Sequence, residues 1–184
     1  MRRLYLVRHA SPSIHPDQPS REWVLSDRGI AEAQALATTA AGWSIDAVYC
    51  GSEPKMRATA LILGDATGAP VHVVAAFDEL RVAAWIGNSD AFNDLVRAIL
   101  EDAPLPRGVE SAAEAATRFT GGLRLIEPGP FPAAVVSGGR ILTSYLTRTR
   151  GVEEPFAYWR AIPVPGWTSV DLDAPREAPQ PFSA

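Results

Sequence analysis

The sequence contains a single cysteine, Cys50, and therefore cannot form an internal disulfide bond. Cys50 falls within an apolar run that predicts a strand, so we interpret it as a buried core residue and not as a nucleophile. No apolar run approaches the roughly 20 residues that a membrane-spanning helix needs. The chain opens on a predicted strand instead of a charged region followed by an apolar signal core. We therefore expect a soluble, cytoplasmic protein.

Basic residues are also few, because 17 lysines and arginines face 21 aspartates and glutamates, which gives a net charge of −4. The sequence has neither a basic patch nor a basic amphipathic helix, which argues against nucleic acid or a membrane surface as a partner. The three histidines, His9, His15 and His72, are scattered and lack the spacing of metal ligands. We expect no metal and no other cofactor.

The composition fits one globular domain. Hydrophobic residues make up 47% of the 184 residues, enough for one sizeable core. We assign this domain to residues 1–172. Residues 173–184 contain three prolines, at positions 175, 179 and 181, and are interpreted as a surface or disordered tail.

The most informative stretch is residues 4–12. Residues 4–7 are apolar and rich in strand formers, and Pro12 prevents the strand from continuing. Arg8 and His9 are thereby placed at the carboxyl end of a buried strand, the edge at which open α/β sheets bind ligands. An arginine offers paired donors to a phosphate, and a neutral histidine is a nucleophile. The pair predicts phosphoryl chemistry, with a solvated turn as the alternative.

Predicted strands and helices alternate along the chain. The strands are expected at residues 4–7, 45–50, 71–74, 133–137 and 169–172, and the helices at 30–41, 55–63, 90–100, 111–126 and 141–150. This alternation predicts a three-layer α/β sandwich with a mainly parallel sheet. We expect the loop at residues 11–25 and an apolar lid at residues 82–88 to shape a pocket over the strand ends.

Several motifs, in order along the chain, resemble those of the histidine phosphatase superfamily, the phosphoglycerate-mutase-like branch of phosphate enzymes. Residues 7–10 resemble its Arg-His-Gly signature. Four further segments are similar to its Leu-Ser-x-x-Gly, Ser-x-x-x-Arg-Ala-x-x-Thr-Ala, Leu-x-Glu and Gly-Gly-Glu-Ser motifs: residues 25–29, 51–60, 77–79 and 108–111. The resemblance covers most of the chain and implies a phosphoglycerate-mutase-like α/β/α sandwich with a mixed sheet.

The resemblance also implies catalytic roles. His9 is expected to attack phosphorus and form a phosphohistidine, while Arg8 holds the phosphoryl oxygens. Glu79 matches the family's acidic residue, and the charge of a neighbouring phosphate would raise the pKa of its carboxyl group, as a general acid requires. Asp78 is the alternative acid, and a surface ion pair between Glu79 and Arg81 is the noncatalytic alternative.

A second phosphate-binding cation is expected at the start of the helix at residues 55–63. The motif register places Lys55 where the family has an arginine, so a point charge replaces a bidentate fork. Arg57 is the second candidate, and an exposed basic residue in the first turn of a helix is the alternative for either. The free N–H groups of this helix start also favour an anion.

The pattern breaks at Ser137-Gly138-Gly139-Arg140, where the family has Ser-His-Gly or Thr-His-Gly. Gly138 stands in the place of the second histidine. Gly138 and Gly139 are expected to leave backbone N–H groups free to bind an anion. Loss of the side-chain donor typically costs about 100-fold to 1000-fold in rate. Three explanations stay open: a deliberate substitution, a natural relative with little or no activity, or replacement of the missing charge by Arg140 or Lys55.

The sequence thus predicts a metal-independent phosphomonoester hydrolase that is impaired by Gly138. Its substrate would be a small-molecule phosphate ester or a phosphoprotein. The alternative is a catalytically inactive relative that binds phosphate or phosphoesters. Mutase activity is less expected, because the chain is short and lacks the long insertions of the phosphoglycerate mutases.

Overall fold

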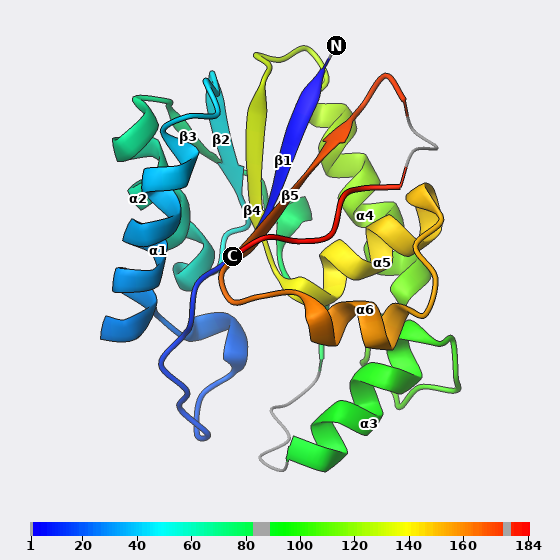
Figure 1. Ribbon diagram of the computed structural model, residues 1–184. Helices are drawn as coiled ribbons and strands as arrows, with labels where there is room; N and C mark the ends of the chain where they lie inside the picture. Colours follow the sequence, from blue (N-terminus) through cyan, green and yellow to red (C-terminus); the bar gives the residue numbers. More distant parts are fainter. Residues whose placement is uncertain (1, 83–88, 175–177) are drawn as a thin grey trace.

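The computed structural model describes residues 2–82, 89–174 and 178–184. Of the predicted lid at residues 82–88, all but Val82 lies outside the described residues. A five-stranded sheet runs through the centre in the order β3-β2-β4-β1-β5 (Figure 1). The strands are β1 Arg3–Arg8, β2 Ala47–Cys50, β3 Val71–Val73, β4 Ala133–Ser137 and β5 Gly166–Asp171. All neighbours pair in parallel except β1 and β5, so the sheet is mixed and mainly parallel, as predicted.

Helices cover both faces of the sheet (Figure 1). On one face lie α1 Asp27–Ala40 and α2 Pro54–Thr67, and on the other lie α4 Ala112–Leu125 and α5 Gly139–Arg150. The remaining helices are α3 Ser89–Leu100 and α6 Pro155–Ala161, with short 3₁₀ turns η1 Ser20–Glu22 and η2 Ala75–Phe77. The three layers confirm the predicted α/β sandwich. No helix in the described part of the chain has the length and apolar character of a membrane span, and the cytoplasmic location stays a prediction.

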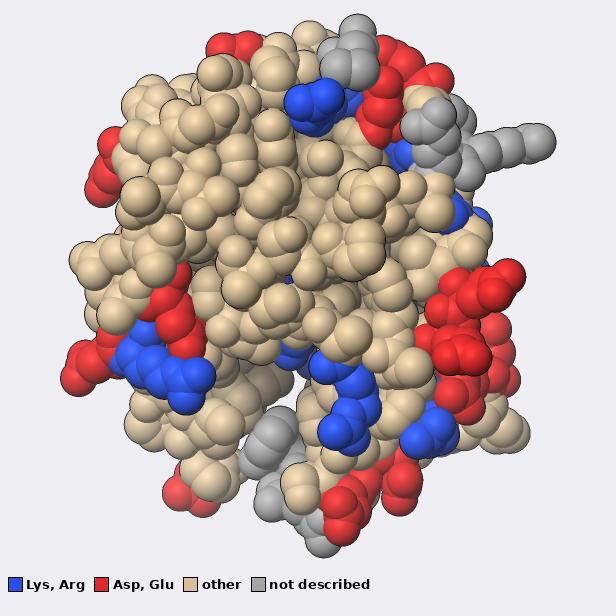
Figure 2. Space-filling view, viewed as in Figure 1, with Lys and Arg blue, Asp and Glu red and all other residues tan. Residues whose placement is uncertain are grey.

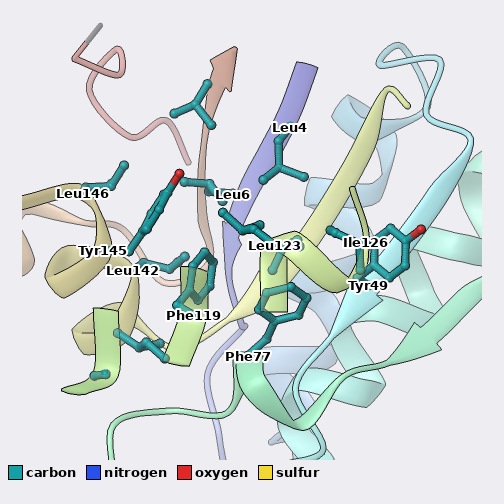
Figure 3. Packing of buried hydrophobic residues seen from close by; sticks show 14 of the residues in the cluster. Leu4, Leu6, Tyr49, Phe77, Phe119, Leu123, Ile126, Leu142, Tyr145 and Leu146 are labelled. Atoms are coloured by element: carbon teal, nitrogen blue, oxygen red, sulfur yellow. The ribbon is translucent and has the colours of Figure 1, made fainter. Parts of the chain in front are cut away.

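Successive side chains of β1 point to opposite faces of the sheet and pack into two separate hydrophobic cores. Leu4 and Leu6 belong to the cluster that includes Phe119 of α4 and Leu142 of α5 (Figure 3). Tyr5 and Val7 belong to the opposite cluster, with side chains of α1 and α2. Complete burial of a leucine side chain contributes about 1.5–3 kcal/mol. The strand that carries Arg8 and His9 is therefore anchored on both of its faces.

The end of α2 differs from the prediction. The end predicted at residue 63 is wrong, because α2 continues to Thr67 and is capped by Gly68, which adopts a left-handed conformation with φ 72°. Gly64 has a packing role, since a Cβ there would lie 2.5 Å from Cγ2 of Val71. The glycine lets α2 approach the start of β3.

The C-terminal part also differs from the prediction. Residues 155–161 form α6, which was not predicted, and β5 begins at Gly166, earlier than expected. Trp167 and Ser183 exchange two backbone hydrogen bonds of 2.8 Å, so residues 178–184 run beside β5. The domain boundary at residue 172 stays a prediction.

Candidate active site

The carboxyl ends of β1 and β4 bring together two motifs that lie far apart in the sequence. Arg8 is in register with Ser137, and the backbone N–H of His9 donates a 3.0 Å hydrogen bond to the Ser137 carbonyl oxygen. The Gly138–Gly139 turn follows at once and begins α5. Parallel pairing thus places His9 beside the N-terminus of α5.

Thr59 of α2 fixes the chain after His9. Its buried hydroxyl accepts a hydrogen bond of 3.2 Å from the Ala10 N–H and donates one of 2.8 Å to the Lys55 carbonyl oxygen. The threonine of the predicted Thr-Ala motif therefore positions the backbone that follows His9.

The start of α1 holds the next residue of this segment. Ser26 is the N-cap of α1: its hydroxyl accepts from the Gly29 N–H and donates to the Ser11 carbonyl oxygen at 3.0 Å. A Cβ on Gly29 would lie 2.0 Å from that Ser11 oxygen, so only glycine allows this approach. The Leu-Ser-x-x-Gly motif thus has a direct structural purpose.

His9 is buried and neutral. His9 is only 8% exposed, and its Nδ1 atom lies 2.8 Å from the Ala10 carbonyl oxygen. Because a carbonyl only accepts, Nδ1 carries the proton and Nε2 keeps its lone pair. Burial lowers the pKa of His9 to about 3, and the charges of Lys55 and Arg8 act in the same direction. The imidazole is therefore neutral over the whole neutral pH range, with a lone pair on Nε2.

Arg8 extends along the same edge. Its Nη1 donates a 2.7 Å hydrogen bond to the Ile162 carbonyl oxygen. Its Nε is buried and has no hydrogen-bond partner among the described residues. A Cβ on Gly139 would lie 2.9 Å from this Nε, so the glycine lets the guanidinium approach the first turn of α5.

A second guanidinium, that of Arg140, lies at the start of α5. Arg140 is 7% exposed, and its Nε lies 3.4 Å from Oε2 of Glu79. Its Cζ lies 5.5 Å from the centre of the Phe92 ring. Its Nη1 is buried without a hydrogen-bond partner in the part of the chain that the structure describes. Arg140, named above only as a source of replacement charge, is thus a residue of the site.

Glu79 binds the N-terminus of α5. Its Oε2 accepts from the Arg140 N–H at 3.2 Å, and its Oε1 accepts from the Ile141 and Leu80 N–H groups at 2.9 and 2.7 Å. Burial alone would raise the pKa of Glu79, but Arg140, the amides of Leu80 and Ile141, and His9 together lower it to about 2. Glu79 is therefore ionised in the free site, and its ion pair is with Arg140 instead of Arg81.

The Glu79 carboxylate also explains why a glycine fits at position 138. A Cβ on Gly138 would lie 2.2 Å from Oε2 of Glu79, so Glu79 occupies the space that a side chain at position 138 would enter. Glu79 accepts from the backbone N–H groups of Arg140 and Ile141, so these two donors of α5 are already bound in the free site. The expectation for the N–H groups of Gly138 and Gly139 stays a prediction.

The two basic candidates of α2 lie on opposite sides of the helix, because a separation of two residues corresponds to a rotation of about 200°. Lys55 is buried, and its ammonium group contacts Oε2 of Glu53 and donates to the Ser20 carbonyl oxygen at 2.6 Å. Arg57 is exposed. The structure therefore brings Lys55, and not Arg57, near His9.

Glu53 is the site residue that the sequence reasoning missed, because it falls at an unspecified position of the motif that residues 51–60 resemble. Glu53 is 7% exposed, and its Oε1 accepts from the Glu79 N–H at 2.9 Å. Burial raises the pKa of Glu53, against the opposing effect of Lys55. An acid placed two residues before the only lysine of the sequence was the signal that could have identified it.

Arg118 holds the segment that carries Glu79. Its Nη1 donates to the carbonyl oxygens of Ala76 and Asp78, both at 2.9 Å, and its Nη2 forms a 2.8 Å ion pair with Glu110. Arg118 thus gives α4 a positioning contact in addition to its packing against the sheet.

Asp78, the alternative general acid, has a structural contact of its own. Its Oδ2 accepts from the Ser52 hydroxyl at 2.8 Å, and its Oδ1 accepts from the Ser52 N–H. A Cβ on Gly51 would lie 2.9 Å from this Oδ1, so the glycine permits the contact. Asp78 therefore ties the end of β2 to the Glu79 segment.

A cavity of about 580 Å³ opens beside these groups. Its walls are residues 16–22, 52–53, 78–82 and Arg140. Figure 2 shows Lys and Arg side chains beside a hollow in the lower half of the molecule, below the carboxyl ends of β1 and β4 as Figure 1 places them. Among residues 2–82, 89–174 and 178–184, no three His, Cys, Asp or Glu side chains gather in a way that could hold a metal ion. The cavity has the size of a small-molecule site.

Comparison with known proteins decides the family. The sequence model of the histidine phosphatase superfamily, branch 1, matches residues 4–179. The chain belongs to the histidine phosphatase superfamily. The layers and the mixed sheet confirm the phosphoglycerate-mutase-like fold. A comparison with curated protein sequences found no match.

Solved structures share this fold at low sequence identity. A mycobacterial glucosyl-3-phosphoglycerate phosphatase in complex with inorganic phosphate is 20% identical, with a TM-score of 0.75 over 100% of this chain and 96% of the other. The alpha-ribazole phosphatase from Shigella flexneri is 22% identical, with a TM-score of 0.73 over 99% of this chain and 96% of the other. At these identities the likeness shows the fold alone.

Proposed function

We propose that this histidine phosphatase superfamily member hydrolyses phosphomonoesters through a phosphohistidine on His9. One observation carries the proposal: a neutral, buried imidazole lies beside Arg8, and the charge of Arg140 acts on Arg8 in turn. Each of these two guanidiniums has a buried nitrogen without a partner in the described residues. Membership of the superfamily supports phosphoester hydrolysis in general.

The two arginines favour an anionic ligand with several oxygens. A buried donor without an acceptor costs about 1–3 kcal/mol, and more when it is charged. Nε of Arg8 and Nη1 of Arg140 are such donors. Since Arg8 contacts the first turn of α5 and Arg140 belongs to it, one phosphoryl group can accept from both side chains.

The proposed reaction has two steps. Nε2 of His9 attacks phosphorus while Arg8 and Arg140 hold the phosphoryl oxygens, and the Nδ1–H to Ala10 contact keeps the ring oriented. Water then attacks the phosphohistidine, the P–N bond breaks, and inorganic phosphate leaves. Lys55 contributes a positive field at His9, while its ammonium group stays paired with Glu53.

The same arrangement supports one explanation for Gly138. Arg140 provides the positive charge that the missing histidine would supply, and Glu79 balances that charge in the free site. A bound phosphate competes with Glu79 for Arg140. We therefore assign Glu79 the positioning of Arg140 and α5, and we expect turnover that is reduced by the missing donor but not abolished.

The substrate is expected to be a small phosphate ester. The cavity of about 580 Å³ suits a small molecule better than a folded phosphoprotein segment. The names of the structural relatives, a glucosyl-3-phosphoglycerate phosphatase and an alpha-ribazole phosphatase, point to the same class.

The test is phosphate release from a panel of aryl and alkyl phosphates. The wild-type protein is expected to release phosphate, His9→Ala to release none, and His72→Ala, an exposed histidine on β3, to match the wild type. The alternative function, phosphate binding without turnover, is favoured by Gly138. It predicts that inorganic phosphate binds, measured by calorimetry, while no substrate of the panel is hydrolysed.

A further inference from the structure

Residues 16–22 form the longest continuous stretch of the cavity wall, and we call them the cavity loop. Glu79 and Arg140 line the same cavity, so the cavity loop borders the proposed phosphate site. An ester whose phosphoryl group is bound by Arg140 has this cavity as the space for its leaving group. The cavity loop is therefore in a position to contact the leaving group.

Trp23 holds the bends of the cavity loop. It is 5% exposed, and its indole Nε1 donates to the carbonyl oxygens of His15 at 3.0 Å and of Gln18 at 3.2 Å. The backbone N–H of Gln18 donates to the same His15 oxygen at 3.0 Å, which closes a turn, and the turn η1 Ser20–Glu22 follows. A buried indole usually finds a hydrogen-bond partner, and here its partners are two carbonyls at successive bends of one loop.

A second contact ties the cavity loop to α2. The buried ammonium group of Lys55 donates a 2.6 Å hydrogen bond to the Ser20 carbonyl oxygen. Pro16 and Pro19 further restrict the backbone of the loop, because a proline ring fixes φ. The protein alone thus sets the conformation of the cavity loop, and a ligand that fits it does not pay the entropy cost of ordering it.

The side chains of the cavity loop are polar and carry charges of both signs. Asp17 and Gln18 are exposed, and neither side chain has a hydrogen bond or ion pair with the described residues. Arg21 and Glu22 are exposed as well, with Nε of the arginine 3.8 Å from Oε1 of the glutamate. Arg81 adds an exposed guanidinium from another part of the cavity wall. The wall therefore offers both donors and acceptors to a ligand.

We propose that the cavity loop selects esters whose leaving group is neutral and rich in hydroxyls, a sugar or a polyol, and that Trp23 is the residue that positions the loop. The proposal rests on the proposed phosphatase function and deepens it by naming the substrate class.

The chemistry of the wall distinguishes three kinds of leaving group. A hydroxyl both donates and accepts, so it can bind to the carboxylates and to the guanidiniums of the wall. An apolar leaving group displaces water from these side chains and offers no hydrogen bond in return. A leaving group with a second negative charge meets Asp17 and Glu22 as well as the two arginines, so the wall as a whole does not attract it.

The experiment compares three esters that share a chain of six carbons and a primary phosphate. Sorbitol 6-phosphate has a neutral polyol as its leaving group, hexyl phosphate has an apolar chain, and 6-phosphogluconate has a polyol with a carboxylate. The three leaving groups differ in their own reactivity, so the decisive quantity is the change in the ratio of two kcat/KM values between the wild type and a variant. Because both values come from one preparation, the ratio does not depend on the fraction of protein that is correctly folded.

Trp23→Phe keeps a buried ring and removes the N–H that holds the cavity loop. It is expected to lower the ratio of sorbitol 6-phosphate to hexyl phosphate about tenfold, through a higher KM for the polyol ester, while kcat for hexyl phosphate stays within about twofold. Asp17→Asn removes a negative charge from the wall and should raise the ratio of 6-phosphogluconate to sorbitol 6-phosphate about twofold to fivefold. The matched control is Trp43→Phe, a buried tryptophan stacked on Tyr5, which should leave both ratios unchanged.

The selectivity is overturned if the wild type prefers hexyl phosphate to sorbitol 6-phosphate, or if Trp23→Phe changes the rates of all three esters by the same factor. Trapping a phosphoryl group on His9 separates this outcome from failure of the function. If His9 is labelled and Trp23→Phe leaves the ratios unchanged, only the selectivity fails. If no ester is hydrolysed and His9 is not labelled, the phosphatase reaction fails, and the dissociation constants of the three esters, measured by calorimetry, decide the selectivity. Equal constants, or no binding of any ester, overturn the selectivity too.

Discussion

The first turns of α2 and α5 each carry a buried basic residue, and the two charges are balanced by anions from different parts of the chain. Each helix begins at the carboxyl end of a parallel strand, and each has a basic residue two positions after its N-cap: Lys55 after Glu53, and Arg140 after Gly138. In α2 the anion that balances the cation is the N-cap residue itself. In α5 it is Glu79, which lies 61 positions away in the sequence.

This difference determines what each cation can do. Lys55 is bound to Glu53 and to the Ser20 carbonyl oxygen, so it acts on His9 mainly through its field. Arg140 keeps one buried nitrogen without a partner in the described part of the chain. Arg140 can exchange Glu79 for a ligand, because Glu79 belongs to a distant segment. Lys55 stays paired, because Glu53 belongs to the same helix turn. The α5 side is therefore the one that should respond to phosphate.

Replacing each of the two cations in turn should have the largest effect on stability. Lys55→Met leaves Glu53 buried beside a single amide donor, and the free energy of unfolding should fall by about 3–5 kcal/mol. Arg140→Met leaves Glu79 with three amide donors, so the loss should be smaller, about 1.5–3 kcal/mol. Urea denaturation at neutral pH measures both, with the exposed Arg57→Met as control. Equal losses would contradict the difference between the two ion pairs.

The pH dependence of stability should separate His9 from Glu79. The pKa of His9 is about 3 in the folded protein against 6.5 for the free group, so below pH 6.5 the unfolded chain takes up a proton that the folded one does not. Stability should therefore fall as the pH drops from 6.5 toward 3, by up to about 1.4 kcal/mol per pH unit.

The corresponding values for Glu79 are about 2 and 4.5, so its contribution is lost only as the pH falls below 4.5. His9→Gln should flatten the stability curve between pH 6.5 and 4.5, whereas Glu79→Gln should flatten it only below pH 4.5. Unfolding free energies from urea titrations across this range test both windows. A curve for His9→Gln that keeps the wild-type slope near pH 5.5 would mean that His9 is not held neutral by the fold.

Substitution of Gly138 should separate stability from activity. Any side chain at this position displaces the Glu79 carboxylate from the N–H groups at the start of α5. Gly138→Ala and Gly138→His should therefore both lower the free energy of unfolding, by about 0.5–2 kcal/mol. Only Gly138→His adds a donor, so its rate should rise by about tenfold or more, while Gly138→Ala gains nothing. The measurements are urea denaturation and aryl phosphate hydrolysis. A gain in both stability and activity for the histidine variant would show that Glu79 does not occupy this space.

Local sequence signals predicted much of the fold and the nucleophile side of the site. The strand that ends at Arg8 and the helix predicted at residues 111–126 depend on neighbours within a few residues, and the structure contains both. Glycine was harder to interpret, because either Gly64 or Gly68 could end the helix and only the approach of Val71 identifies Gly64 as the packing glycine.

The electrostatics of the site could not be predicted in the same way. The sequence argument predicted a raised pKa for Glu79, because a phosphate would lie beside it. The fold lowers the pKa of Glu79 in the free site, because Arg140 and the start of α5 surround the carboxylate. The contact between Glu53 and the N–H of Glu79 likewise joins segments 26 residues apart. Such contacts depend on how strand ends meet, which residue spacing does not reveal.

The most direct test of the account is to trap the phosphoenzyme. The protein is mixed with a phosphomonoester, quenched within milliseconds in alkali, in which phosphohistidine survives, and mapped by mass spectrometry. The account predicts a phosphoryl group on Nε2 of His9 in the wild type, and a yield reduced about 100-fold to 1000-fold in Arg140→Met. A phosphoryl group on another residue, or equal labelling in Arg140→Met, would contradict the roles assigned to His9 and Arg140.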